Sequence, residues 1–367
     1  MKSKIIVFHL LNNFTGSPMI LRNVLELMVR NDYEVELYTS SGEGFLSGIS
    51  GINYNKNFYF RSKNKFFTFF TFFLSQFSLF WVILFKIPKS NSVIYVNTIL
   101  PFSAILAAKL SRIPVIAHVH EDKVHPRILN SFLFFITNKF SNYLILVSNY
   151  LCKNHIHTNS KIKVVYNSVS SDFFAYPKPI KSKQEATFTV LMLASLRSYK
   201  GLPAFLEISK LLPNINFNLV LSDATQEVNK YFLGECIPSN MNIFSLQKNV
   251  HNFYNEADLV INLSDKDSWV ETFGMTILEA MHYRLPVIVP ILGGITELVE
   301  DGKNGFLLDS KEINSIADKI NCLATDQILW EKMSNRSFEL TDFFSIGNFE
   351  KGIKNVIEEA FKSSVRN

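Results

Sequence analysis

The chain has 367 residues, of which 47% are hydrophobic and 19% charged, with a formal net charge of +5 at pH 7. This length allows two domains of ordinary size, and this hydrophobic content excludes an intrinsically disordered chain. Three cysteines without a Cys-x-x-Cys pair argue against a disulfide-stapled domain or a zinc site, and favour reduced thiols in a cytoplasmic protein.

Charge is distributed unevenly along the chain. Residues 1–172 carry 18 Lys and Arg against 8 Asp and Glu, and the remainder carries 19 against 24, so the two parts stand at +10 and −5 and sum to +5. A basic part favours an anionic partner, although a merely solvated basic face is the alternative on charge alone. No nucleic-acid motif accompanies the charge, so we expect an anionic membrane surface and no nucleic acid partner.

The first half alternates predicted strands and helices, which is typical of a parallel sheet covered by helices. The predicted strands are 5–11, 34–38, 93–96, 114–118, 143–147 and 163–166. One predicted helix ends at residue 30, and two others cover residues 66–85 and 102–110. Residues 5–11 are too short, and too soon followed by Asn12 and Asn13, for a signal peptide. Residues 42–48 are one residue too long for Gly-x-Gly-x-x-Gly, which argues against a dinucleotide-binding dehydrogenase.

Residues 66–85 form an uncharged, phenylalanine-rich stretch with lysines on both sides. Its length would permit a transmembrane span. Polar side chains nevertheless recur at helical spacing on one stripe, at Thr68, Thr71, Ser75 and Ser78. Three alternatives therefore stay open: an interfacial or groove-forming helix with lysines meeting lipid phosphates, a plain core helix, or a true span. A span would split a Rossmann-like domain between two compartments, so we expect the first.

Residues 117–121 follow a predicted strand and read Ala-His-Val-His-Glu. Ligand sites in α/β proteins form at this carboxyl edge of the sheet. Alternation along the strand puts His118 and His120 on one face, and Asp122 and His125 lie nearby in the sequence, so a metal site is one alternative. The remaining geometry is unspecified, and we expect no metal.

The second half begins after residues 170–185, a stretch rich in Pro, Lys and Ser that predicts a linker. A strand over 189–193 leads into a loop with Arg197, Lys200 and Gly201. Two cations between a strand and a helix suit a diphosphate, which arginine can hold through two parallel hydrogen bonds. A surface loop that happens to be basic is the alternative reading of this segment alone.

Two carboxylates, Glu271 and Glu279, stand eight residues apart around Phe273 and Gly274. Glycine permits a tight turn, and residues 275–281 are good helix formers. The first amides of a helix favour an anion, whereas carboxylates accept hydrogen bonds from vicinal hydroxyls. The stretch therefore suggests a ligand that carries both sugar and phosphate, although the spacing by itself also suits two solvated acids.

The neighbours of this stretch stand in a distinctive order. Before it come a helix end and a buried strand (254–264), and after it an apolar strand (285–289), a Gly-Gly-Ile-Thr-Glu segment (293–297) and Asp-Gly-Lys-Asn-Gly (301–305). This run closely resembles the nucleotide-sugar half of the family-four glycosyltransferases, which are retaining enzymes of the GT-B fold. Several linked elements in one register are more specific than any single motif.

The resemblance implies an α/β fold of two Rossmann-like, doubly wound domains facing across a cleft. Residues 1–172 are expected to form the acceptor-side domain and residues 173–344 the nucleotide-sugar domain. A closing helix at about 345–367 is expected to pack back on the first domain.

The resemblance also implies roles for individual residues. Glu271 and His120 are expected to be catalytic, with Glu271 orienting the donor sugar and His120 hydrogen-bonding it near the reacting carbon. The expected donor-binding residues are Gly16, Arg197, Lys200, Phe273, Gly274, Met275, Thr276 and Glu279, the last on the ribose hydroxyls. The family carries Gly-Arg where this chain has Ala194 and Ser195, and Arg197 is the candidate for the missing charge.

These expectations describe a retaining, metal-independent glycosyltransferase without a cofactor. It would move a sugar from a UDP- or GDP-sugar to a hydroxyl of a saccharide acceptor, lipid-linked, in capsule or lipopolysaccharide assembly. We expect it in the cytoplasm, peripheral on the inner face of the membrane. Two alternatives remain on the same architecture: a sugar-nucleotide 2-epimerase, and a degenerate transferase acting as a membrane-associated binding subunit.

Overall fold

The computed structural model describes residues 3–62, 64–155, 160–170, 173 and 187–364. The chain divides into two compact units, one made of Met1–Asn167 with Ile346–Asn367, and the other of Ser168–Ser345. The boundary follows Asn167, five residues before the expected one. Most of the linker expected over 170–185 lies outside the described residues.

A seven-stranded parallel sheet forms the centre of the first unit, in the order β3-β2-β1-β4-β5-β6-β7. Its strands are β1 (Lys4–Phe8), β2 (Glu34–Thr39), β3 (Ile52–Lys56), β4 (Ser92–Asn97), β5 (Val115–Val119), β6 (Tyr143–Leu146) and β7 (Lys161–Val164). The central strands read as near-continuous apolar runs because helices cover both of their faces, and residues 5–8 of β1 are 0% exposed.

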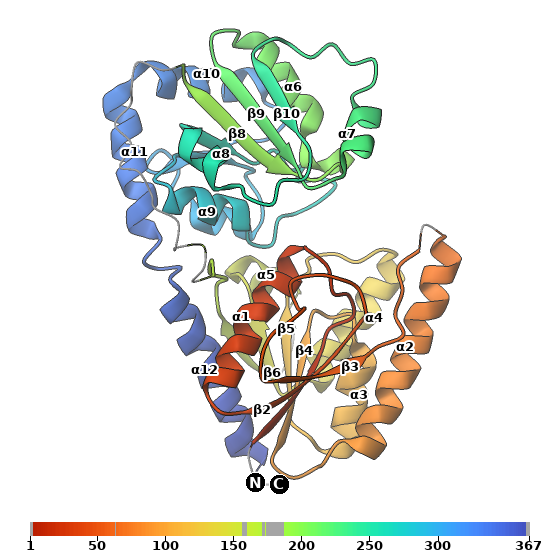
Figure 1. Ribbon diagram of the computed structural model, residues 1–367. Coiled ribbons are helices and arrows are strands. Elements are labelled where there is room, and N and C mark those ends of the chain that lie inside the picture. The colour runs from red at the N-terminus through yellow and green to blue at the C-terminus, as the bar shows by residue number, and fades with distance from the viewer. Residues whose placement is uncertain (1–2, 63, 156–159, 171–172, 174–186, 365–367) are drawn as a thin grey trace. The chain divides into compact units, whose positions relative to one another are not determined.

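Helices cover both faces of this sheet (Figure 1). They are α1 (Gly16–Arg30), α2 (Lys65–Lys86), α3 (Phe102–Ser111), α4 (Arg127–Phe140), α5 (Asn149–His155) and α12 (Ile346–Ser364). Helices α1 and α12 contact each other, while α2, α3 and α4 form a row in which each contacts the next. The C-terminal helix α12 contacts β4, β5 and β6, so it completes the first unit.

The second unit contains a six-stranded parallel sheet in the order β10-β9-β8-β11-β12-β13. Its strands are β8 (Thr189–Ala194), β9 (Asn216–Leu221), β10 (Met241–Phe244), β11 (Leu259–Ile261), β12 (Val287–Val289) and β13 (Gly305–Leu307). Its helices are α6 (Leu202–Leu211), α7 (Thr225–Tyr231), α8 (His251–Glu256), α9 (Met275–His282), α10 (Ile313–Thr325) and α11 (Gln327–Leu340), with short 3-10 helices η2 (Ser198–Lys200) and η3 (Gly294–Leu298). Two doubly wound α/β units confirm the predicted GT-B fold class.

The predicted elements of both units are present with small shifts. Strand β7 begins two residues before the predicted 163–166, and β1 ends at Phe8 rather than at residue 11. In the first unit, strand β3 and helices α4 and α5 were not predicted. The exposure of most of β3 explains this, because an edge strand without an apolar face lacks the hydrophobic pattern of a core strand.

Helix α2 has an unusual distribution of side chains, with polar groups facing inward and phenylalanines facing outward. Thr71, Ser75 and Gln76 are 7%, 0% and 3% exposed. Gln76 Oε1 accepts hydrogen bonds from the backbone N (3.2 Å) and Oγ (2.9 Å) of Ser103, on α3. Thr71 Oγ1 donates to the carbonyl of Phe60 (2.7 Å). Thr71 of the predicted polar stripe, together with Gln76 outside that stripe, therefore joins α2 to its own domain.

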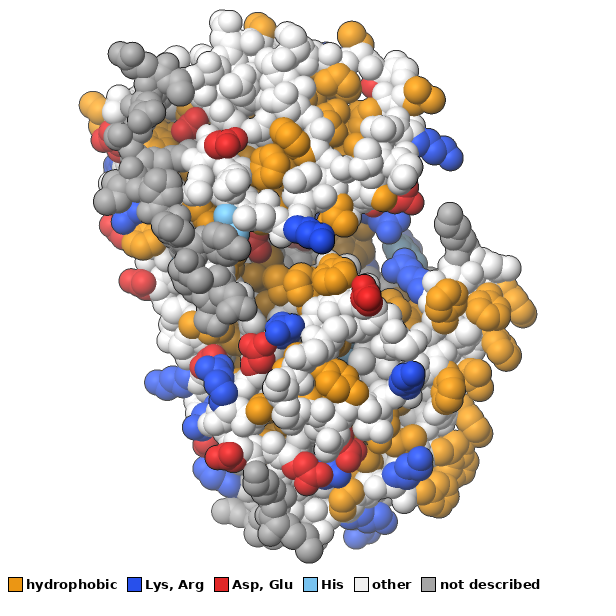
Figure 2. Space-filling view, in the orientation of Figure 1, with side chains coloured by type: hydrophobic (Ala, Val, Ile, Leu, Met, Phe, Trp, Pro, Cys, Tyr) orange, Lys and Arg blue, Asp and Glu red, His pale blue; other side chains and the backbone are white. Residues whose placement is uncertain are grey.

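The outward face of α2 is a continuous apolar surface, visible along the helix in Figure 2. Its exposed members are Phe66, Phe67, Phe69, Phe70, Phe73, Leu74, Phe77, Trp81 and Phe85. Exposed apolar residues of α4, namely Ile128, Phe132 and Phe135, add to the apolar surface of this unit. Among the described residues, α2 contains a segment long and apolar enough to cross a membrane (Phe66–Lys86), but the inward hydrogen bonds tie one face of it to protein. A plain core helix does not fit the exposed phenylalanines.

Candidate functional site

The turn before α9 is built around Gly274. This residue has φ 102°, and a Cβ there would lie 2.6 Å from Cγ1 of Ile295, so both backbone and space require glycine. Helix α9 starts at Met275, and the first-turn amides of Met275 and Thr276 belong to a helix N-terminus that favours an anion. Phe273 is 2% exposed and packs edge-on against Phe344, so its side chain belongs to the core and its backbone carries the turn.

Glu271 lies just before this turn and is held from three sides. Its Oε1 pairs with Nζ of Lys200 and accepts a hydrogen bond from Oγ of Ser264 (2.9 Å). Its carbonyl accepts from the backbone N of Ile295 (3.4 Å). A Cβ at Gly293, which has φ 114°, would lie 2.5 Å from that carbonyl. Gly293 therefore lets the start of η3 approach the backbone of Glu271 closely.

The basic loop after β8 contributes Lys200 through η2. Gly201, at φ 76°, follows it because a Cβ there would lie 2.2 Å from the carbonyl oxygen of Leu263. The Nζ of Lys200 lies at Glu271, and the two side chains are 20% and 16% exposed. Arg197 is exposed at the start of η2. The structure thus brings Lys200 and Glu271 together and leaves the Arg197 side chain at the surface.

Glu279 lies in the second turn of α9. The hydroxyl of the fully buried Tyr254, on α8, donates a hydrogen bond of 2.6 Å to Oε2 of Glu279. Burial raises the pKa of Glu279 to about 7, while the bond from Tyr254 acts in the opposite direction. Burial also raises the pKa of Tyr254 well above its usual value, so the phenol keeps its proton.

In the first unit, His120 directly follows β5. Its Nε2 lies 3.0 Å from Oδ1 of Asn97, the last residue of β4, and its backbone N donates to Oε2 of Glu121 (3.2 Å). The His118 and His120 rings are 4.2 Å apart, and His118 Nδ1 lies 2.8 Å from the Tyr95 hydroxyl. Burial, and then the two neighbouring histidines, lower the pKa of His120 well below its usual value, so the ring is neutral.

Gly16 begins α1, after a loop that other residues brace. Asn12 Nδ2 donates to the carbonyl of Gly42 (2.7 Å) and to Oγ of Ser47 (2.9 Å). A Cβ at Gly44 would lie 2.3 Å from the backbone N of Asn13. The glycines at 42 and 44 therefore serve close packing of two loops, which explains them without a dinucleotide.

Several residues of these sites escaped the sequence analysis. In the second unit they are Tyr254, Ser264 and Gly293, and in the first they are Asn97 and Glu121. Tyr254 and Asn97 are polar residues that the fold buries, at 0% exposure each, and a single sequence holds no sign of which neighbour each will meet. Gly293 carried a usable signal, because consecutive glycines between a strand and a short helix indicate a close backbone approach.

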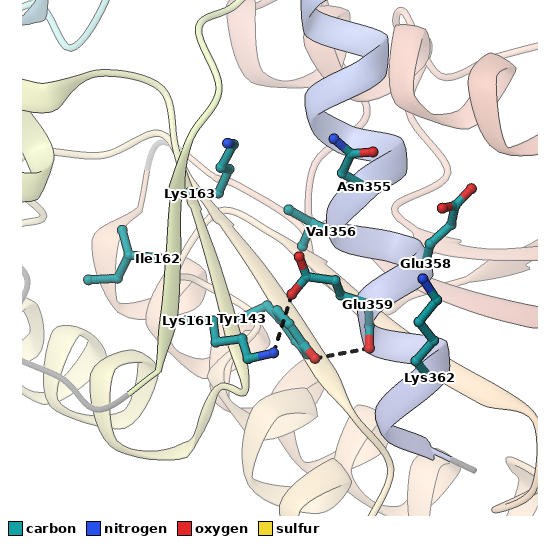
Figure 3. A pocket seen from close by; sticks show the side chains of 9 residues that line it. All are labelled: Tyr143, Lys161, Ile162, Lys163, Asn355, Val356, Glu358, Glu359 and Lys362. Carbon is teal, nitrogen blue, oxygen red and sulfur yellow. Dashed lines mark hydrogen bonds and ion pairs between the residues drawn. The ribbon is translucent and has the colours of Figure 1, made fainter. Parts of the chain in front are cut away.

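Two hollows lie elsewhere. One of about 240 Å³ lies between β7 and α12 (Figure 3) and holds the Lys161–Glu359 pair (3.3 Å). The other, of about 480 Å³, is lined by residues of α6, α10 and the segment before β9. Tyr143 and Lys161 are the first residues of β6 and β7, so the first hollow lies at the amino ends of strands, whereas His120 follows the carboxyl end of β5.

The structure forms no metal-ligand set from His, Cys, Asp or Glu side chains within the residues it describes. His118 instead contacts Tyr95, and Asp122 Oδ1 lies 2.6 Å from Nε2 of His155. The described residues therefore do not form the alternative grouping of His118, His120, Asp122 and His125 around a metal.

The chain was compared with known proteins. An uncharacterized glycosyltransferase of Methanocaldococcus jannaschii is 26% identical over 263 residues, which cover 70% of this chain and 71% of that protein. A sucrose synthase of Denitrovibrio acetiphilus is 40% identical over 73 residues, or 19% of this chain, and the match spans only 9% of that relative's length. The crystal structure of Anabaena HepE in complex with UDP and glucose has a TM-score of 0.76 at 17% identity, covering 96% of this chain and 99% of that one, and so shares the fold.

Family models account for most of the sequence. Residues 14–173 match the model described as Glycosyltransferase Family 4, and residues 177–340 match the one described as Glycosyl transferases group 1. The two matches fall on the first and second structural units respectively, apart from a few residues near the boundary. The chain therefore belongs to the glycosyltransferases, with a Family 4 domain followed by a group 1 domain.

Proposed function

We propose that this protein is a retaining glycosyltransferase that transfers a sugar from a nucleoside-diphosphate sugar to a hydroxyl of a saccharide acceptor. The observation that carries the proposal is the Gly274 turn, which places a helix N-terminus between Glu271, paired with Lys200, and the partly buried Glu279. This arrangement offers one anion site and two carboxylates within a single unit. Anabaena HepE was crystallised with UDP-glucose, which supports a UDP-sugar as the first donor to try.

Each group has a defined task in this proposal. Glu279 in its ionised form accepts hydrogen bonds from the ribose hydroxyls. Lys200, the amides that follow Gly274, and Arg197 stabilise the negative charge that develops on the departing diphosphate. This set of cations and amides needs no metal ion for that task. Glu271 orients the donor sugar by accepting hydrogen bonds from the sugar hydroxyls. When the donor binds, the Lys200 ammonium group exchanges its contact with Glu271 for a contact with the diphosphate.

His120 of the first unit contacts the donor sugar in this proposal. Its ring is neutral, so it acts through a hydrogen bond rather than through a positive charge. The acceptor hydroxyl oxygen bonds to the anomeric carbon on the face from which the diphosphate leaves, as the bond between that carbon and the diphosphate breaks. The hydroxyl proton passes to the departing diphosphate oxygen. This retains the anomeric configuration and requires no covalent intermediate on Glu271.

The test of the donor site is calorimetric titration of the protein with UDP-, GDP-, ADP- and CMP-sugars, repeated with Glu279→Ala. Loss of hydrogen bonds to a charged group should weaken the true donor by roughly 1.5–3 kcal/mol. Glu256→Ala, which removes an exposed carboxylate from α8, is the matched control and should leave affinity unchanged. Protein that is folded yet binds no nucleotide sugar would overturn the proposed function.

A binding-only role is the second candidate, because Ser195 stands where the resemblance calls for an arginine and Arg197 is exposed. The two candidates differ in turnover. Release of free nucleoside diphosphate with an acceptor present supports transfer, whereas donor binding without release over hours supports the binding subunit. Ser195→Arg should leave a working transferase active, and would be expected to raise diphosphate affinity in a degenerate one.

We further propose that the acceptor is a lipid-linked saccharide of cell-surface polysaccharide assembly and that the protein acts peripherally at the cytoplasmic face of the membrane. The outward phenylalanines of α2 support a lipid surface as the partner, because they form an exposed apolar face. The polar side chains Thr71 and Gln76, on the inward face of the same helix, already have hydrogen-bond partners inside the domain. Exposed Lys86 and Lys89 at the helix end suit anionic headgroups. The helix lies in the interface plane, since one face is bound to α3.

Vesicle flotation tests this surface. Phe69→Ser with Phe73→Ser and Phe77→Ser should reduce recovery with vesicles containing phosphatidylglycerol. Phe72 is 6% exposed and belongs to the core, so it must be left intact. Leu233→Ser with Ile328→Ser, which removes exposed apolar residues from the second unit, is the control. Equal flotation of the triple variant and the wild type would contradict a membrane role for α2.

A further inference from the structure

Asn97 lies at the meeting point of three segments of the first unit. It is the last residue of β4 and is 0% exposed. Its side chain contacts Nε2 of His120 (3.0 Å), the carbonyl oxygen of Ser17 (3.3 Å) and Nδ1 of His9 (3.2 Å). These partners come from the segment after β5, the first turn of α1 and the segment after β1. One amide thus joins the candidate catalytic histidine to the glycine loop.

The partners of Asn97 determine the orientation of its amide. The carbonyl oxygen of Ser17 can only accept, so the group facing it must be the NH₂. The Oδ1 atom therefore faces Nε2 of His120, which must carry a proton in order to donate. In the opposite orientation two oxygens would face each other at Ser17. The neutral His120 ring then has its proton on Nε2 and a free lone pair on Nδ1.

The backbone around this contact is held in place by Glu121. Its Oε2 accepts from the backbone N of Ile99 (3.2 Å) and of His120 (3.2 Å), which joins the segments after β4 and β5. Thr98 lies between Asn97 and Ile99 with φ 74°, and its backbone N donates to the carbonyl of His118 (2.8 Å). The residues that flank Asn97 and His120 therefore keep the two side chains at a fixed separation.

We propose that Asn97 is a positioning residue that holds His120 as the Nε2–H tautomer, so that Nδ1 accepts a hydrogen bond from a hydroxyl of the donor sugar. This inference rests on the proposed function, because it assigns a ligand atom to His120. Through Ser17, the same amide couples the orientation of that ring to the start of α1. An imidazole with the proton on Nδ1 would donate instead of accept and would mismatch the same hydroxyl.

The tautomer can be measured without any activity. Imidazole ¹⁵N spectra of histidine-labelled protein, assigned with His120→Gln, should show His120 protonated at Nε2 and unprotonated at Nδ1. Asn97→Leu removes the acceptor, so the His120 signals should move toward the other tautomer or a mixture. Asn97→Asp keeps an acceptor and adds a negative charge, so His120 should titrate at higher pH than in the wild type. The groups facing His120 in that titration are His9, His118, Glu121 and the new carboxylate.

Kinetics supply the second measurement. Asn97→Leu should lower kcat roughly 10- to 100-fold, the scale of a misplaced catalytic group, and change UDP affinity less than twofold, because UDP binds the second unit. Asn57→Leu is the matched control, since Asn57 is buried in the same unit and, among the described residues, neither of its polar side-chain atoms has a hydrogen-bond partner. It should leave the His120 spectrum unchanged, and thermal unfolding identifies any variant that fails to fold.

The outcomes separate this inference from the proposed function. An unchanged His120 tautomer in folded Asn97→Leu overturns the inference, even if the wild type transfers sugar. A changed tautomer with unchanged kcat overturns the assignment of the sugar hydroxyl to Nδ1. A wild type that binds no nucleotide sugar overturns the proposed function and, with it, the ligand assigned here, while the spectra still report whether Asn97 sets the tautomer.

Discussion

The hydroxyl of Tyr254 donates a 2.6 Å hydrogen bond to the partly buried carboxylate of Glu279. Tyr254 is itself 0% exposed and stacks on Tyr283, with ring centroids 5.3 Å apart, so the hydroxyl has little freedom to move. A buried carboxylate that must accept hydrogen bonds from a ligand has to remain ionised. Tyr254 favours the ionised form and so opposes the effect of burial.

Donor affinity should depend on pH through Glu279. Burial raises the pKa of this group to about 7, and only the ionised carboxylate accepts from two ribose hydroxyls. Affinity should therefore rise as the pH is raised through about 7 and fall below it. Tyr254→Phe removes a bond to the ionised form, so the midpoint should move upward and binding at pH 7 should weaken by roughly 1 kcal/mol. Calorimetry at several pH values measures both effects.

The control for that series is Tyr231→Phe, which removes a hydroxyl from an exposed residue of α7 in the same unit. A midpoint in Tyr254→Phe that equals the wild-type value would show that Tyr254 does not tune Glu279.

Substitution of Gly293 should disturb Glu271 through its backbone. A Cβ at this position lies 2.5 Å from the Glu271 carbonyl, and the residue has φ 114°, so Gly293→Ala combines a clash with backbone strain. Strain of this kind costs on the order of 1–3 kcal/mol, and donor binding should fall at the same time. Gly302→Ala is the matched comparison, because φ is 74° there but no atom lies within 4 Å of the added Cβ. It should lose stability without losing donor binding, as measured by urea unfolding and titration.

Removal of Lys200 should affect the diphosphate more than the nucleoside. Lys200→Met leaves Glu271 with the Ser264 hydroxyl as its remaining side-chain partner among the contacts described, and removes the partly buried cation of the loop. UDP affinity should fall by roughly 1.5–3 kcal/mol, whereas uridine affinity should change little. Lys210→Met, on the exposed side of α6, serves as the control. Equal losses for UDP and uridine would contradict a diphosphate contact.

The contribution of Glu121 to the stability of the first unit should decrease as the pH rises through the neutral range. Burial raises the pKa of Glu121 from 4.5 to about 7. The folded state therefore binds this proton more tightly than the unfolded state, and the stabilisation is present below the unfolded pKa and lost as the pH rises toward 7. The full effect is up to about 3 kcal/mol. Compared with the wild type, Glu121→Gln should lose less stability, or gain more, as the pH rises from about 5 to about 8, as followed by urea unfolding.

If the free energy of unfolding of Glu121→Gln falls with pH as steeply as that of the wild type, the pH dependence comes from other groups. Glu279 in the second unit acts in the same direction as Glu121, because burial raises its pKa to the same value. His9 and His118 in the first unit act in the opposite direction, because burial lowers their pKa values to about 4 and about 3. The double variant with Glu279→Gln separates the two contributions.

Much of the second unit could be read from the chain. Gly274 and the helix after it were predictable because a glycine that needs positive φ and a run of helix formers act locally. The paired sheets were predictable because buried parallel strands require continuous apolar residues. Strand β3 was missed because most of its side chains are exposed. The role of the glycines at 42 and 44 could not be predicted, because it depends on close packing against the loop at Asn13, which is distant in sequence.

The sequence alone determined the alternation of strands and helices, the turn at Gly274 and the identity of the two carboxylates, since each depends on residues close together in the chain. The tertiary structure determined which polar side chains meet: Tyr254 with Glu279 across 25 residues, and Asn97 with His120 across 23. It also placed Phe72 on the buried face of α2 and Phe73 on its exposed face. These contacts depend on packing between elements distant in sequence, where burial decides hydrogen-bond partners and pKa values and no local pattern records them.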